Sequence, residues 1–141
     1  MSKSFDVFHA GAWSDLGQYC FQPNPDFKID GKLFLGRKLE LNGAEASLSR
    51  MPAGSAMPFF HRHKHNEELY IFVGGSGEMQ IDDERFVVGE GTVVRVTSSA
   101  DRIWRNTSTS DLYFICVQYR EGVAADCEGS DGEVVKRPLP W

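Results

Sequence analysis

Three of the four histidines in this 141-residue chain lie within a span of five residues, and two glutamates follow them closely. His61 and His63 are two residues apart, so an extended strand would direct both imidazoles toward the same face. Glu67 and Glu68 then begin a second, apolar stretch. Two neutral imidazoles and a carboxylate on one face, with coordination positions left open, suit a divalent first-row metal ion. The spacing therefore predicts a metal site of two histidines and one glutamate.

The three side chains can meet if the second stretch folds back beside the histidine strand. A polar turn over residues 64–66 allows this, and it would place one carboxylate opposite the imidazoles. Glu67 and Glu68 point to opposite faces of a strand, so one of them faces the histidines and the other faces away. His65 offers a substitute third imidazole if the first strand continues, but the turn favours a loop position exposed to solvent.

Short apolar segments separated by turn signals occupy most of the chain, and no segment shows helical spacing over three turns. This pattern predicts an all-β sandwich or barrel. Asn42-Gly43 is the strongest two-residue hairpin signal and predicts that residues 37–41 pair with residues 44–51. An irregular arm is expected over residues 1–25. The other expected strands are residues 27–30, 33–35, 67–73, 78–81, 85–88, 92–96, 102–106 and 112–119, with a closing extended segment at 134–141.

Composition narrows the class of protein. The chain is 41% hydrophobic and 25% charged, which is typical of one globular domain, here residues 1–141 with a core at about 40–120. Its net charge of -5 argues against a nucleic-acid partner. No apolar run of about 18 residues indicates a membrane span, and no signal peptide is recognisable, so a cytoplasmic location is expected. Cys20, Cys116 and Cys127 lack paired spacing and are expected to be free thiols.

Two strands are apolar on both faces, namely residues 69–73 and residues 112–119. A small barrel in water should leave its outer face polar. We therefore expect the outer face to be covered by the N-terminal residues or by a second subunit, and we predict a homodimer.

The motif around the histidines resembles the first motif of the cupin superfamily, G-x5-H-x-H-x3-4-E-x6-G. Its two histidines correspond to His61 and His63, its glutamate to Glu68, and its final glycine to Gly75. The leading glycine is displaced by one residue, to Gly54. The spacing to the final glycine favours Glu68 over its neighbour as the inward carboxylate.

The second cupin motif, G-x5-P-x-G-x2-H-x3-N, is matched only in part. Gly91 and Asn106 take its first glycine and its asparagine. Thr97 and Ser99 replace the motif's proline and second glycine, and Arg102 replaces the histidine that is the fourth metal ligand. The resemblance covers roughly residues 40–120. Within the superfamily, the chain is similar to small bacterial single-domain cupins. This resemblance implies an all-β, double-stranded β-helix (jelly-roll) barrel.

The resemblance also implies a divalent ion (Fe, Mn, Ni or Zn) bound by His61, His63 and Glu68. Arg102 admits two interpretations, because a guanidinium carries only donors and cannot coordinate a metal. It pairs with Glu68 and replaces the ion, or it lies above a three-ligand metal and binds an anionic group of a substrate. Tyr70, Gln80 and His65 are further candidate substrate contacts, each with a simpler role in packing or at the surface.

Two functions are consistent with these residues. One is a metal-dependent enzyme of the isomerase, lyase or oxygenase type that acts on a small polar or anionic molecule. The other is a metal-free barrel that binds or senses a small ligand, with Arg102 paired to Glu68. In both cases the expected partner is a small molecule, and the sequence does not identify it.

Overall fold

The computed structural model describes residues 4–122 and residue 138, and nearly all of its regular structure is β-strand. The elements in chain order are the 3-10 helix η1 (Trp13–Gln18) and the strands β1 (Cys20–Asn24), β2 (Phe27–Asp30), β3 (Lys32–Phe34), β4 (Glu45–Met51), β5 (Asn66–Gly74), β6 (Ser76–Ile81), β7 (Glu84–Gly89), β8 (Val93–Val96), β9 (Arg102–Arg105) and β10 (Leu112–Arg120). The prediction of an all-β chain is confirmed.

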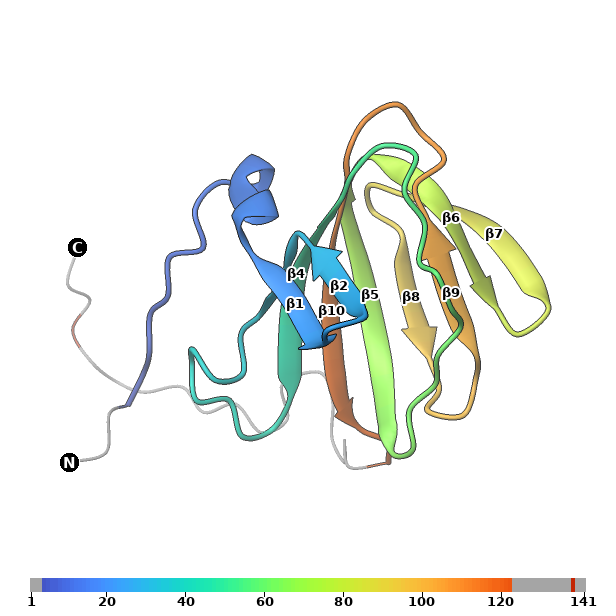
Figure 1. The fold of residues 1–141 in the computed structure, drawn as a ribbon. Coiled ribbons are helices and arrows are strands. Elements are labelled where there is room, and N and C mark those ends of the chain that lie inside the picture. Colours follow the sequence, from blue (N-terminus) through green and yellow to red (C-terminus); the bar gives the residue numbers. More distant parts are fainter. Residues whose placement is uncertain (1–3, 123–137, 139–141) are drawn as a thin grey trace.

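Two antiparallel sheets form the body of the fold (Figure 1). The larger sheet has the strand order β3-β4-β10-β5-β8, and the smaller sheet has the order β7-β6-β9. Strands that are neighbours in space are mostly remote in sequence, with β10 lying between β4 and β5. This arrangement is that of a jelly-roll barrel. A separate hairpin of β1 and β2 lies in front of the larger sheet in Figure 1.

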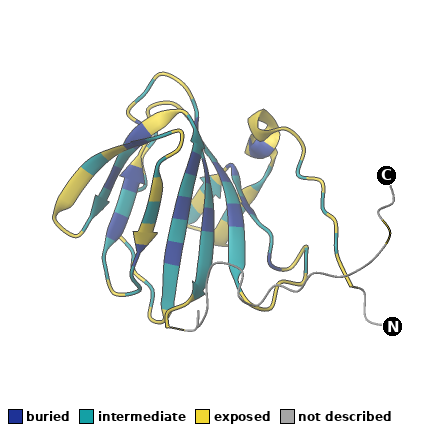
Figure 2. Ribbon diagram, turned by 180° about the vertical axis from the view of Figure 1, so that it is seen from behind, coloured by how far each residue is buried: buried dark blue, intermediate teal, exposed yellow. Residues whose placement is uncertain are grey.

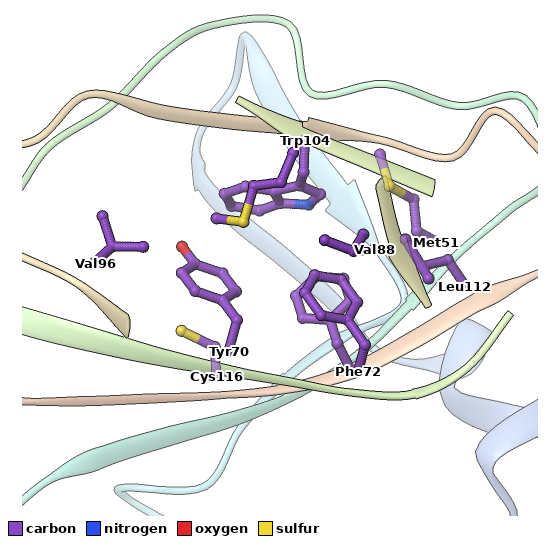
Figure 3. Close-up of a cluster of buried hydrophobic side chains, with 10 residues drawn as sticks. Met51, Tyr70, Phe72, Val88, Val96, Trp104, Leu112 and Cys116 are labelled. Atoms are coloured by element: carbon purple, nitrogen blue, oxygen red, sulfur yellow. The ribbon is translucent and has the colours of Figure 1, made fainter. Parts of the chain in front are cut away.

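The core fills the space between the sheets. Buried residues alternate with half-buried ones along β5 and β10, so dark and light bands alternate on these strands in Figure 2. In Figure 3, Tyr70, Phe72 and Cys116 rise from one layer and Trp104 descends from the other. The full buried cluster comprises Met51, Tyr70, Phe72, Met79, Val88, Val96, Trp104, Leu112, Phe114 and Cys116.

The N-terminal residues cover part of the outer face of the larger sheet. Leu16 of η1 is buried against β3 and β4, and Trp13 contacts Tyr113 of β10 at 6.0 Å between ring centroids. Residues 69–73 of β5 keep half-buried side chains at the outward positions. The homodimer therefore stays a prediction. Among the described residues, no helix is long and apolar enough to cross a bilayer.

Two expectations about local structure were wrong. Residues 37–41 form no strand: the chain turns over residues 36–40, with Leu39 N–H donating to the Leu35 carbonyl at 3.0 Å. The carboxylate of Glu45 accepts the Gly36 N–H at 2.7 Å and fixes this turn, so β4 pairs with β3 and β10 instead of a hairpin partner. The arm expected at residues 1–25 contains η1 and β1. Cys127 lies outside the described residues. So does the extended segment expected at 134–141, except for residue 138.

A glycine makes the passage from one sheet to the other possible. Gly75 lies between β5 and β6 with a φ of 77°, in the left-handed region that other residues rarely adopt. A Cβ atom there would lie 2.2 Å from the carbonyl oxygen of Asp111. The glycine that closes the first motif is therefore required by the backbone.

Candidate metal centre and ligand pocket

The histidine segment is held against β9 of the smaller sheet. His61 N–H donates to the Arg102 carbonyl at 3.1 Å, and Arg102 N–H donates back to the His61 carbonyl at 2.9 Å. His63 N–H donates to the Ser98 carbonyl at 3.0 Å. The histidine segment does not pair with the strand that carries the glutamate, which was the arrangement the sequence suggested as one way for them to meet, since β5 pairs with β10 and β8. The carboxylate instead comes from β5 of the larger sheet, and the imidazoles come from a segment outside the named strands that is bridged to β9 of the smaller sheet.

Glu68 is 2% exposed, and both of its carboxylate oxygens have partners. Oε1 lies 3.0 Å from Nε2 of His63 and accepts a weak hydrogen bond from the Cys116 thiol at 3.6 Å. Oε2 accepts the Tyr70 hydroxyl at 2.5 Å and lies 3.1 Å from Nε of Arg102. One oxygen thus faces a histidine, whereas the other is held by a phenol and a cation.

The three predicted ligands form one cluster. Their ligand atoms, from His61, His63 and Glu68, all lie within 4.8 Å of one another, and Nε2 of His61 is 3.9 Å from Oε2 of the carboxylate. Glu67 faces away and forms an ion pair with Arg95 at 2.7 Å, so the inward carboxylate is the one that the motif spacing favours.

Arg102 is fully buried. Its Nη1 donates to the carbonyls of Ala100 at 2.8 Å and Ser98 at 3.4 Å, and its Nη2 donates to the carbonyl of Thr97 at 3.1 Å. Nε approaches Glu68 as an ion pair without the alignment of a hydrogen bond. The guanidinium therefore directs its Nη donors to the loop before β9 and its Nε to the Glu68 carboxylate. It is absent from the pocket wall described below, so it is not placed to contact a ligand.

These contacts change the protonation of the cluster. Burial alone would raise the pKa of Glu68, but the hydrogen bond from Tyr70 and the charges of His63 and Arg102 lower it overall. Burial lowers the pKa of His61 to about 4, with Glu68 opposing this shift. At neutral pH the cluster therefore presents an ionised carboxylate and a neutral His61, which are the forms that bind a metal ion.

The donor set fits a divalent ion. Imidazole nitrogen and carboxylate oxygen bind such ions at roughly 2.0–2.2 Å, so two ligand atoms of one ion lie roughly 3 Å apart. His63 and Glu68 have this separation, and the 3.9 Å between His61 and the carboxylate requires a small shift. Tyr70 and Arg102 hold the second oxygen, as outer partners of ligating carboxylates commonly do. The positive charge of Arg102 acts in the opposite sense, because it repels a cation.

A cavity of about 440 Å³ opens beside the cluster and includes all three candidate ligands in its wall. The β1–β2 hairpin forms one side, where Phe21 packs on Phe34 at 4.9 Å and Phe27 on Phe59 at 4.7 Å between ring centroids. Tyr70 and Trp104 line the floor from the barrel core. The lining residues are Phe21, Pro23, Asn24, Phe27, Ile29, Lys32, Phe34, Met57, Phe59, His61, His63, Glu68, Tyr70, Trp104 and Gln118.

Two candidate contacts lie elsewhere. Gln80 was expected to line the interior, but its amide donates to the Asp82 carbonyl at 2.8 Å and accepts from Arg85, at a separate hollow on the smaller sheet. The reason is the phase of β6, in which Met79 takes the buried position. His65 is exposed and stands outside the cluster, as the loop interpretation expected.

Lys32 is a pocket residue that the sequence did not reveal. It lies in a three-residue strand, too short for a periodic pattern to show which face is buried. Its position follows from the register of β3 with β4, and Asn42-Gly43, the hairpin dipeptide in the connection between these strands, does not indicate that residues 32–34 are the partner.

Two antiparallel sheets with a histidine-histidine-glutamate cluster on the inner wall define a jelly-roll barrel with a metal-capable interior. The "Cupin domain" family model matches residues 47–118, and the chain belongs to this family. A crystal structure of a cupin protein from Bacteroides fragilis is similar, with 34% identity and a TM-score of 0.71 over 74% of this chain and 89% of that chain.

Two further proteins are similar over shorter parts. An uncharacterized protein of Methanocaldococcus jannaschii is 29% identical over 79 residues, which are 55% of this chain and 62% of that protein. The crystal structure of a predicted oxalate decarboxylase from Thermotoga maritima is 24% identical, with a TM-score of 0.51 over 53% of this chain and 64% of that one. This last likeness concerns the fold alone.

Proposed function

We propose that this cupin binds one divalent first-row ion through His61, His63 and Glu68 and acts on a small polar or anionic molecule in the adjoining pocket. The observation that supports this is the joint placement of the three ligand atoms, within 4.8 Å of one another, in the wall of a cavity of about 440 Å³. A ligand site that opens on a cavity leaves coordination positions for a substrate.

Different residues contact the two oxygens of the Glu68 carboxylate. Tyr70 and Arg102 fix Oε2 of Glu68, which leaves Oε1 directed at His63. The backbone bridge between His61 and Arg102 of β9 holds the His61 imidazole from the side of the smaller sheet. A bound divalent ion supplies Lewis-acid polarisation to an isomerase or lyase, or redox chemistry to an oxygenase. The aromatic side chains in the pocket wall would contact the bound molecule.

A second function is favoured by a different observation. Nε of Arg102 lies 3.1 Å from Oε2 of Glu68, so the carboxylate already has a buried cation as a neighbour. In a metal-free barrel this pair would keep the cluster neutral, and the pocket would bind or sense a ligand without chemistry.

Metal analysis separates the two functions. Protein purified without chelator and analysed by elemental mass spectrometry should contain close to one divalent ion per chain, and the ion should be lost in His61→Ala and His63→Ala. His65→Ala is the matched control, because this exposed imidazole lies outside the cluster. Added metal should also raise the melting temperature, since an ion at a hundredfold excess over its dissociation constant stabilises the native state by about 2.7 kcal/mol. Protein that contains no ion, with a melting curve unaffected by chelator and by added Fe, Mn, Ni and Zn, would support the metal-free barrel.

A further inference from the structure

We infer that Lys32 is the anion-binding residue of the pocket, and that the ligand is a small carboxylic acid with an aromatic or aliphatic body whose carboxylate pairs with the Lys32 ammonium. This inference rests on the proposed function in so far as the same pocket receives the substrate. The binding of an anionic ligand group, which the second motif suggested for Arg102, is thereby assigned to Lys32 on β3.

Strand register directs Lys32 into the barrel. Lys32 is paired with Ser49 of β4, and Phe34 is paired with Ser47. Directly paired residues of antiparallel strands lie on the same face. Ser47 and Ser49 are buried inward residues of β4, whereas Leu33 faces the other way. The lysine therefore extends over an inner surface of small side chains.

The Lys32 ammonium has no carboxylate partner within 4.0 Å in the part of the chain that the structure describes, and Nζ lies 5.0 Å from the ring centroid of Phe34. Lys28, which precedes it on β2, is by contrast paired with Asp30 at 2.9 Å. Burial lowers the pKa of Lys32, because desolvation penalises the charged amine. Lys32 is half-buried, and the carboxylates of Glu68 and Glu45 act on it only from beyond ion-pair distance, so a ligand that supplies an adjacent negative charge would stabilise the ammonium.

A second polar group beside the lysine also lacks a partner. Ser49 is 6% exposed, and its Oγ forms no hydrogen bond to the described residues. It lines a neighbouring hollow of about 410 Å³ whose wall shares Lys32, Phe27 and Trp104 with the first pocket. An unsatisfied buried hydroxyl costs free energy that a ligand acceptor would recover. One ammonium and one hydroxyl suit a singly charged carboxylate.

The rest of the wall determines the body of the acid. Four phenylalanines and Trp104 line the pocket, and its polar side chains are Lys32, Asn24, Gln118, Tyr70 and the three candidate metal ligands. An aromatic or aliphatic body would bury more apolar surface against these rings than a sugar, whose several hydroxyls each need a polar partner. Arg102 cannot bind the acid group, because it is fully buried and its Nη atoms already donate to three carbonyls.

The test compares acids with their neutral amides. Phenylacetate, hexanoate and indole-3-acetate are titrated by calorimetry into chelator-treated protein, each against phenylacetamide, hexanamide or indole-3-acetamide. We expect at least one acid to bind more tightly than its amide, and Lys32→Met to weaken that acid roughly tenfold to hundredfold while leaving the amide unchanged. Lys32→Arg should restore most of the preference, and Lys64→Met, the control, should behave as wild type, because this exposed lysine lies outside both hollows.

Three results would overturn the inference: no acid preferred over its amide, equal acid affinity in Lys32→Met and wild type, or inorganic phosphate binding as tightly as the acids. The melting temperature of Lys32→Met shows whether that variant is folded, and Lys32→Arg decides the point if it is not. Metal content is measured in the same samples. Metal loss in His61→Ala with acid preference retained separates the two proposals, because the chelator-treated titration does not depend on an ion.

Discussion

Replacing Arg102 by methionine tests whether the buried ion pair organises the cluster. The substitution leaves the Glu68 carboxylate, 2% exposed, without its adjacent cation. It also removes the donors to three loop carbonyls. Removing one partner of a buried pair costs about 3–5 kcal/mol. Arg102→Met should therefore lower the free energy of unfolding by about that amount at pH 7, a large part of the roughly 5–15 kcal/mol typical of a domain.

Urea unfolding of chelator-treated protein, followed by tryptophan fluorescence, measures this loss. Arg105→Met is the matched control on the same strand: its ion pair with Glu78 is half exposed, and such pairs contribute about 0–1 kcal/mol. The double variant Arg102→Met/Glu68→Gln should regain stability relative to Arg102→Met, because both charges are then gone. A loss in Arg102→Met no larger than that in Arg105→Met, or no recovery in the double variant, would refute this account of the cluster.

Three other outcomes are expected. Tyr70→Phe removes the hydroxyl that donates to Glu68 and should cost about 1.5–3 kcal/mol at pH 7 in urea unfolding. This cost should shrink below the ordinary glutamate pKa of about 4.3, since a protonated carboxyl no longer needs the donor. The folded-state pKa of His61, about 4, lies below its ordinary 6.5, so the unfolded chain binds the proton more tightly. The free energy of unfolding should therefore fall by up to about 3 kcal/mol as the pH drops from 6.5 to 4. His61→Gln should reduce this dependence of stability on pH, and an unchanged dependence would contradict the assignment. Gly75→Ala should lower the melting temperature far more than Gly91→Ala, because both glycines have positive φ but only the first would place its Cβ against backbone, 2.2 Å from a carbonyl oxygen; equal effects would show that this turn adapts.

The convergence of His61, His63 and Glu68 could be predicted because alternation along a strand and the motif spacing both depend on local geometry. The burial of Arg102 could be predicted in the same way, from its position in the second motif. The strand pairing that brings these side chains together could not be predicted. It joins the histidine segment to β9, about forty residues away, and nothing in either segment encodes that register.

Local signals also failed where a longer-range contact overrode them. Asn42-Gly43 is a strong hairpin dipeptide, but the preceding residues form a turn fixed by the Glu45 carboxylate, and β4 finds its partners elsewhere. Lys32 was missed because it lies outside the expected strand of residues 33–35, and three residues are too few to reveal a face. Gln80 was misplaced because the phase of its strand is set by Met79, which packs into the core.

The β1–β2 hairpin and Lys32 precede residues 47–118, the part of the chain that carries the family's shared pattern. The candidate ion ligands lie within that part. If the proposed site is correct, cupins could diverge in the ligand that they bind through changes upstream of the shared pattern, while the candidate ion ligands stay in place. We expect an exchange of residues 20–34 with a cupin that has a corresponding hairpin to change the ligand preference and to leave the His61, His63 and Glu68 cluster intact.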